Sequence, residues 1–155
     1  MVGSTFLYVL SAQEPGKQST DNQPNKQKAM KQFTSPYIKY YDDREIVTFP
    51  DGITEIVERG LVGAQLKTVI LPDTVTTIGQ GAFLGAAIES VILPEGLKVI
   101  GDYAFAACMN LRKIYLPERL EKIGDGAFLG CVRLETMNIP NTVHFVGKDV
   151  FALCR

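Results

Sequence analysis

Three regularly spaced cysteines are the residues of this sequence most able to do chemistry. Cys108, Cys131 and Cys154 lie 23 residues apart, and alanines occupy the two preceding positions of the same series, Ala64 and Ala86. A metal site or a disulfide would use such thiols, but zinc sites favour close cysteine pairs and include other ligand types. Exchange between alanine and cysteine is typical of a narrow buried niche. We therefore expect three reduced, buried and metal-free thiols, and no cofactor.

His144 is the only histidine, and its surroundings predict a surface residue. A catalytic histidine needs a nucleophile or an acid held beside it. The nearest candidates, Thr142 and Asp149, stand in no recognisable motif. The sequence contains neither a glycine-rich phosphate-binding motif nor a His-Glu-x-x-His metal motif. These residues predict a protein that is not an enzyme.

The composition is that of a folded domain. Of the 155 residues, 46% are hydrophobic and 21% are charged. Sixteen Lys and Arg against seventeen Asp and Glu give a net charge of −1, so the chain lacks the basic surplus that neutralises nucleic-acid phosphates. No apolar run approaches the roughly 18–20 residues of a membrane-spanning helix. We expect neither a nucleic-acid binder nor a membrane span.

The first 32 residues differ from the rest of the chain. Residues 13–32 are almost entirely polar, and such a segment cannot bury enough apolar surface to offset the entropy of ordering it. We predict a flexible linker there, followed by one domain over residues 33–155. Residues 1–12 contain a short apolar run from Phe6 to Leu10. They are interpreted either as the remnant of an export signal or as a segment that docks on a partner.

A repeat begins after residue 45 and dominates the remaining sequence. Prolines at positions 50, 72, 94, 117 and 140 open successive units, with spacings of 22, 22, 23 and 23 residues. The predicted units are 50–71, 72–93, 94–116, 117–139 and the incomplete 140–155. Apolar residues recur at fixed positions within them, and one such column is Leu61, Phe83, Phe105, Phe128 and Phe151. Units this short cannot enclose a core alone, so they must bury these columns by stacking.

The sequence of each unit predicts a strand, then a turn, and then a segment that leads back to the next strand. The segments before the prolines alternate apolar and polar residues as strands do, and proline then turns the chain. Glycines at positions 79, 101, 124 and 147 predict a tight, left-handed turn. The following segment with its phenylalanine predicts one helical or 3-10 turn. The expected fold is an α/β repeat: a right-handed leucine-rich-repeat solenoid with one parallel sheet and short helical or 3-10 turns on the other side.

The units from Ile46 to Arg155 resemble the BspA-like branch of leucine-rich repeats, whose units run roughly P-x-x-V-T-x-I-G-x-x-A-F-x-x-C-x-x-L-x-x-V-x-L-P. The resemblance implies a cell-surface or secreted protein that mediates adhesion and binds a protein partner. The first unit departs from the pattern between Val57 and Leu61, which fits a degenerate N-terminal cap. The alternative hypothesis is a structural subunit of a larger, intracellular assembly.

The side chains that point outward from the predicted strands form columns across one face of the sheet. One column contains two isoleucines and a tyrosine, which are typical of an interface, although such residues also favour strands that bind nothing. Arginine and tyrosine are enriched in binding hot spots. The predicted partner-binding residues are Lys67, Ile70, Ile92, Arg112, Lys113, Tyr115, Glu135 and Asn138.

The last unit contains no strand after its turn, so the strand predicted from Leu134 to Ile139 would be an open sheet edge. Solenoids normally need a cap at such an end. Three explanations are considered: the chain continues past Arg155, a partner covers the edge, or a second copy of the chain does so.

Overall fold

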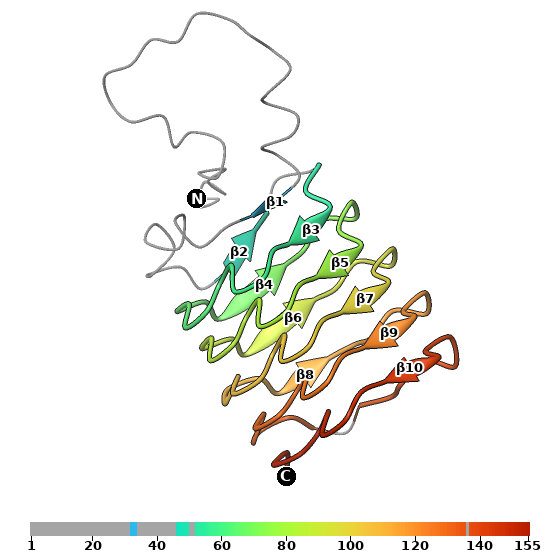
Figure 1. Cartoon of the computed structure of the whole chain (residues 1–155). Helices are drawn as coiled ribbons and strands as arrows, with labels where there is room; N and C mark the ends of the chain where they lie inside the picture. Colours follow the sequence, from blue (N-terminus) through green and yellow to red (C-terminus); the bar gives the residue numbers. More distant parts are fainter. Residues whose placement is uncertain (1–31, 34–45, 50–51, 136) are drawn as a thin grey trace, which may run out of the picture.

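The computed structural model describes residues 32–33, 46–49, 52–135 and 137–155. These residues wind into a parallel β-solenoid of about four turns, with one coil stacked on the next (Figure 1). The described strands are β1 (Gln32–Phe33), β2 (Ile46–Thr48), β3 (Glu55–Ile56), β4 (Thr68–Ile70), β5 (Thr77–Ile78), β6 (Ser90–Ile92), β7 (Val99–Ile100), β8 (Lys113–Ile114), β9 (Lys122–Ile123) and β10 (Phe145–Val146).

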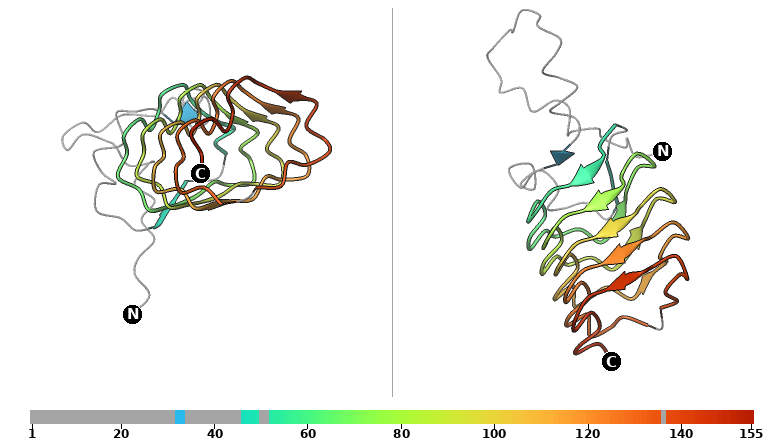
Figure 2. Two further views of the ribbon diagram at one scale, coloured as in Figure 1. Left: turned by 90° about the horizontal axis from the view of Figure 1, so that it is seen from below. Right: turned by 45° about the vertical axis from the view of Figure 1, so that its right-hand side comes forward.

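The strands form two sheets, and the prediction of a single sheet was wrong. A six-stranded sheet has the order β1-β3-β5-β7-β9-β10, and a four-stranded sheet has the order β2-β4-β6-β8. The two sheets lie on opposite sides of the flattened coil (Figure 2). The sequence predicted no strand at residues such as Thr77 and Ile78, which precede the turn expected at Gly79. These residues are extended instead, because the backbone N–H and C=O groups of each coil lie against those of the next coil in both sheets.

The helical or 3-10 turns that the sequence predicted are absent from the described residues. In the turn that contains Phe83, Ala82 and Leu84 donate their N–H groups to carbonyl oxygens three residues back. The alternate residues Gly81, Phe83 and Gly85 donate to the next coil instead, each at 2.8 Å. A 3-10 helix needs consecutive bonds between residues three apart. The alternation therefore prevents a helix and adds the turn to the hydrogen-bond ladder between coils.

The glycines at positions 79, 101, 124 and 147 were expected to adopt left-handed backbone, and this expectation was wrong. None of the four has a positive φ. They allow neighbouring coils to approach closely. A Cβ atom on Gly101 would lie 2.8 Å from the Gln80 nitrogen and 2.9 Å from the Ile78 carbonyl oxygen of the preceding coil. Any side chain at this position would push the two coils apart.

Left-handed backbone occurs at two other positions of each turn, with φ between 53° and 72°. Alternating right- and left-handed residues turn successive N–H groups in different directions, which accounts for the alternating hydrogen bonds. One column of left-handed residues is Arg59, Gly81, Tyr103, Gly126 and Asp149, and the other is Gly63, Gly85, Ala107, Gly130 and Leu153.

We expect Ala107→Gly to stabilise the fold. Ala107 has a φ of 56°, and left-handed backbone costs a residue with a Cβ about 1–2 kcal/mol. Glycine also raises the conformational entropy of the unfolded chain, and this offsets about 0.4–1 kcal/mol of the stability gained by relieving the strain. Urea titration should show a net increase of about 0.5–1 kcal/mol in unfolding free energy. The control Ala106→Gly, at a buried neighbour without positive φ, should destabilise; equal effects would contradict the argument.

The core is a set of stacked apolar columns, as the sequence predicted. Phe83, Phe105 and Phe128 are each 0% exposed. Their rings stack with centroids 5.1 Å and 5.4 Å apart and with planes within 3° of parallel. Phe151 extends the stack at 5.7 Å but is only half-buried, because no described coil covers it.

Two predicted boundaries also differ from the structure. Gln32, the last residue of the predicted linker, belongs to β1 and pairs with Glu55 of β3. The strand predicted from Leu134 to Ile139 does not form over residues 134–135 and 137–139, so the four-stranded sheet ends at β8. Among the described residues, this segment has a neighbouring coil on one side only, and a bond from the Glu135 N–H to the Arg112 carbonyl oxygen joins it to that coil. The predicted segment 1–12 and linker residues 13–31 lie outside the described residues.

Candidate recognition surface

Six of the eight predicted partner-binding residues lie in or next to β4, β6 and β8, and Glu135 and Asn138 lie in the segment of the next coil that follows β8. All eight lie on the side away from the core, which we call the outer face. Backbone bonds stack Lys67, Glu89, Arg112 and Glu135 directly: the N–H of each of the last three donates to the carbonyl oxygen of the residue before it in the series, at 2.7–3.1 Å. Opposite charges therefore alternate along this column. These residues lie side by side because each occupies the equivalent position in its coil.

A second column of the outer face is apolar and aromatic. Ile70 pairs with Ile92 between β4 and β6, and Tyr115 follows in the next coil. Ile92 is 52% exposed and Tyr115 is 80% exposed, whereas Ile70 is half-buried. Ile46 also exposes its side chain at the first strand of this sheet. Ile46 pairs with Thr68, so it belongs to the column of Thr68, Ser90 and Lys113, and it was not predicted because it precedes the proline that opens the first unit.

A hollow of about 440 Å³ lies on the outer face beside Tyr115. It exists because the chain after Leu134 does not join the sheet alongside β8. Two of its lining residues form an ion pair, with Lys113 Nζ 3.4 Å from a carboxylate oxygen of Glu135. Both side chains are more than half exposed, so the pair adds little stability and its charges are available to a partner. The lining residues are Lys113, Ile114, Tyr115, Leu116, Glu118, Glu135, Met137 and Asn138.

Four of the residues that line the hollow were predicted for binding, and two polar or flexible residues, Glu118 and Met137, were missed. Met137 aligns with the inward column that contains Val69 and Val91, so its position indicated core. It is half-buried because the last described coil leaves the sheet. Glu118 follows Pro117 in a turn, and no sequence pattern marked it. Within the described part of the chain, no group of three or more His, Cys, Asp or Glu residues could hold a metal ion.

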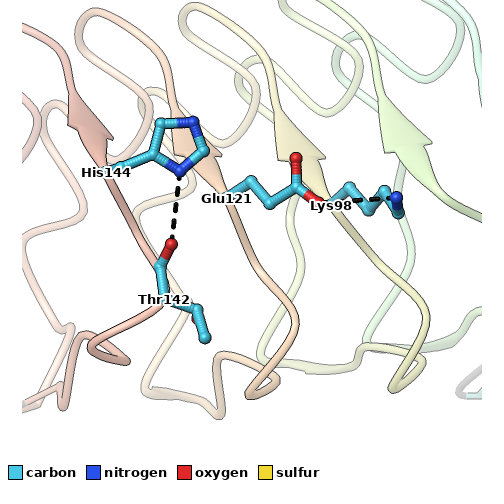
Figure 3. A network of polar contacts seen from close by, with 4 residues as sticks. All are labelled: Lys98, Glu121, Thr142 and His144. Atoms are coloured by element: carbon cyan, nitrogen blue, oxygen red, sulfur yellow. Dashed lines mark hydrogen bonds and ion pairs between the residues drawn. The ribbon is translucent and has the colours of Figure 1, made fainter.

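His144 lies on the opposite, six-stranded side and contacts no catalytic group among the described residues. Its Nδ1 atom is 3.4 Å from the carbonyl oxygen of Thr142, and the ring is exposed (Figure 3). The nearest carboxylate along its column, Glu121, forms an ion pair with Lys98 at 3.4 Å (Figure 3). This arrangement fits a surface histidine, as the sequence predicted.

The three cysteines form a ladder in which each thiol donates a hydrogen bond to the phenylalanine carbonyl oxygen of the preceding coil. All three thiols are free, as expected, and Cys108 and Cys131 are buried. The expected burial of Cys154 was wrong, because this residue is partly exposed in the last coil. Burial raises the pKa of all three thiols. The bonds are Cys108 to Phe83 at 3.1 Å, Cys131 to Phe105 at 3.1 Å and Cys154 to Phe128 at 3.2 Å.

The raised pKa of Cys131 should make the fold less stable as the pH rises above 9. Burial, reinforced by the Cys154 thiol, raises the pKa of Cys131 from 9.0 to about 12. The unfolded thiol ionises above pH 9 and the folded one does not, so its contribution is complete below pH 9 and is lost between pH 9 and about 12. The unfolding free energy should be measured from pH 8 to 11 in both the unmodified protein and Cys131→Ala. It should fall less steeply with pH in Cys131→Ala, and the two slopes should differ by about 1 kcal/mol per pH unit. Equal slopes in the two proteins would contradict the assignment.

The family model for the BspA type leucine rich repeat region matches residues 35–155, with six copies. The chain therefore belongs to the BspA-type leucine-rich repeat family. A comparison with curated proteins found no match. No described helix has the length and apolar character needed to cross a membrane.

Solved structures of bacterial leucine-rich repeat proteins share the fold. The Leucine Rich Repeat protein of T. pallidum (TpLRR) is 34% identical with a TM-score of 0.67, over 69% of this chain and 53% of that one. A leucine rich cell surface protein from Faecalibacterium prausnitzii is 30% identical with a TM-score of 0.66, over 73% and 31%. The pneumococcal vaccine antigen PcpA is 28% identical with a TM-score of 0.62, over 71% and 28%. The chain spans about half of the first of these proteins and about a third or less of the other two.

Proposed function

We propose that this chain is a non-enzymatic protein-recognition module of a cell-surface or secreted protein, and that it acts in adhesion. The observation that carries the proposal is the outer face, which presents both an exposed apolar and aromatic column and a column of alternating charges. Two of the similar proteins are described as a cell surface protein and a vaccine antigen, which supports a location outside the cell.

The chemistry of the outer face favours a protein partner. Tyr115 and Ile92 present large apolar surface next to Arg112 and Lys113, and an apolar centre with charged residues around it is the usual composition of a protein interface. The hollow beside Tyr115 gives a partner side chain a place to insert, with a lysine and a carboxylate at its rim. Because the two charges have opposite sign, the surface favours a peptide with mixed charges over a polyanion.

We expect the double substitution of Arg112→Ala and Tyr115→Ala to weaken partner binding by roughly 2 kcal/mol or more, about 30-fold in Kd. Both side chains are exposed, so the fold should be unaffected. The measurement is biolayer interferometry of the full chain against immobilised fibronectin, laminin and collagen, three matrix proteins that a surface adhesin meets.

The matched control carries the same substitutions elsewhere, Tyr103→Ala with Arg133→Ala, at exposed positions in the turns between the sheets. Its affinity should remain that of the unmodified chain. Equal losses in the two double variants, or none in the first, would place the binding site off the outer face. Absence of binding to all three matrix proteins would contradict adhesion to matrix.

A further inference from the structure

The turns that follow β4, β6 and β8 present a line of negative charges along one margin of the outer face. Each turn opens with a proline and is closed by the same hydrogen bond, from a backbone N–H to the proline carbonyl oxygen three residues back, at 3.0–3.1 Å. The residue after the proline is acidic and exposed in all three coils. We call these residues the acidic ridge: Asp73, Glu95 and Glu118.

The uniform sign of the acidic ridge distinguishes it from other charged columns of the solenoid. The column that begins at Lys67 alternates in sign, and Lys98 forms an ion pair with Glu121 of the next coil. Within the described part of the chain, no residue of the ridge forms an ion pair. Arg119 is the one cation in these three turns, which keep a net charge of −2. Because like charges in neighbouring strands repel, the ridge does not stabilise the fold, and its carboxylates are available to a partner.

The acidic ridge runs parallel to the apolar column of the outer face. Ile70, Ile92 and Tyr115 each precede a ridge residue by three positions. Ile92 and Tyr115 are strongly exposed, although the coils that carry them have a described coil on each side. Stacking of coils therefore leaves this apolar column and its negative margin uncovered.

The spacing of the coils matches the spacing of turns in an α-helix. From coil to coil, the stacked phenylalanine rings of the core lie 5.1 Å and 5.4 Å apart. An α-helix rises about 5.4 Å per turn, so a helix that lies along the solenoid axis can place one side chain against each coil. In an extended peptide, side chains on one face recur about every 6.6 Å and lose register with the coils.

We propose that the outer face binds one basic amphipathic helix of a partner protein, which lies along the solenoid axis across β4, β6 and β8. Its apolar stripe contacts Ile70, Ile92 and Tyr115, and lysines or arginines on one flank pair with the acidic ridge. These ion pairs are exposed, so they select a basic partner more than they add affinity. The inference rests on the proposed function, because it names the partner that the outer face recognises.

Fluorescence polarisation of a labelled synthetic helix with the full chain tests the proposal. The probe is stapled in helical form, about 16 residues or four turns long, with leucines along one face and lysines along the adjacent flank. We expect it to bind, and a second probe with glutamates in place of the lysines to bind at least roughly tenfold more weakly. The double substitution of Glu95→Gln and Glu118→Gln should weaken binding of the lysine probe about tenfold. Urea unfolding should show no loss of stability in this variant, since both side chains are exposed.

The matched control, Glu55→Gln with Glu58→Gln, removes the same charge on the six-stranded side and should bind the lysine probe as the unmodified chain does. Equal losses in the two double variants, or no loss in the ridge variant, would overturn the proposal. Equal binding of the two probes, or binding of neither, would also overturn it. A dimer of the unmodified chain that dissociates in Ile92→Asp would make a second copy the occupant instead.

The proposed function is tested separately. It fails if Arg112→Ala with Tyr115→Ala leaves binding to the matrix proteins unchanged. A loss in that variant, combined with no effect of the ridge substitutions on the lysine probe, would overturn only the basic helix as partner.

Discussion

Phe105→Ala is expected to lower the unfolding free energy by about 3–5 kcal/mol. The Phe105 ring is fully buried between those of Phe83 and Phe128 and lies within 5.4 Å of each, so its removal leaves a cavity that neither neighbour can fill without abandoning its own stacking. Denaturant titration followed by far-ultraviolet circular dichroism measures the change.

Phe151 provides the matched control for Phe105, because it belongs to the same stack but is half-buried at the last coil. Phe151→Ala should cost less than half as much, since the site lacks a neighbour on one side and can collapse more readily. Equal costs for the two variants would mean that the coils do not share one continuous core.

The second large effect is expected at Gly101. Gly101→Ala would place a Cβ within 3 Å of the backbone of the preceding coil and disturb the 2.8 Å bond from the Gly101 N–H to the Ile78 carbonyl oxygen. Overpacking and a weakened hydrogen bond together should cost about 3 kcal/mol. Thermal and urea unfolding should both show the loss.

Gly96→Ala is the control for this substitution. A Cβ on Gly96 would meet its nearest atom, the Asp73 carbonyl oxygen, at an ordinary 3.4 Å, and Gly96 has no positive φ. The reduced entropy of the unfolded chain should leave Gly96→Ala within about 0.5 kcal/mol of the unmodified protein or slightly more stable. If both variants lost the same stability, close coil approach would not be the reason for glycine at position 101.

The stacking of the units and their core columns could be predicted from sequence, because a side chain that recurs at the same position of every unit has the same neighbours in every coil. Phe83 and Phe105 follow from this argument alone. The second sheet and the missing helix could not be predicted in the same way. Gly81 and Gly85 signal backbone freedom, but only the hydrogen bonds to the next coil show that alternate N–H groups leave the turn.

The candidate site was predictable to the extent that it depends on register. Ile70, Ile92 and Tyr115 fall on one face because each occupies the same position in its unit. The hollow beside Tyr115 was not predictable, since it depends on where the chain after Leu134 leaves the sheet. The alternation of apolar and polar residues predicted a strand from Leu134 to Ile139, and the structure has none over residues 134–135 and 137–139.

Hydrogen–deuterium exchange of the full chain, alone and saturated with a matrix protein that binds it, tests the recognition surface most directly. We expect binding to slow backbone exchange in residues 113–116, 118, 135 and 137–138, which line the hollow, while β5 and β7 of the opposite sheet keep their rates. Slowed exchange confined to the six-stranded sheet or to the turns, with no change at residues 113–116, would contradict binding through the outer face.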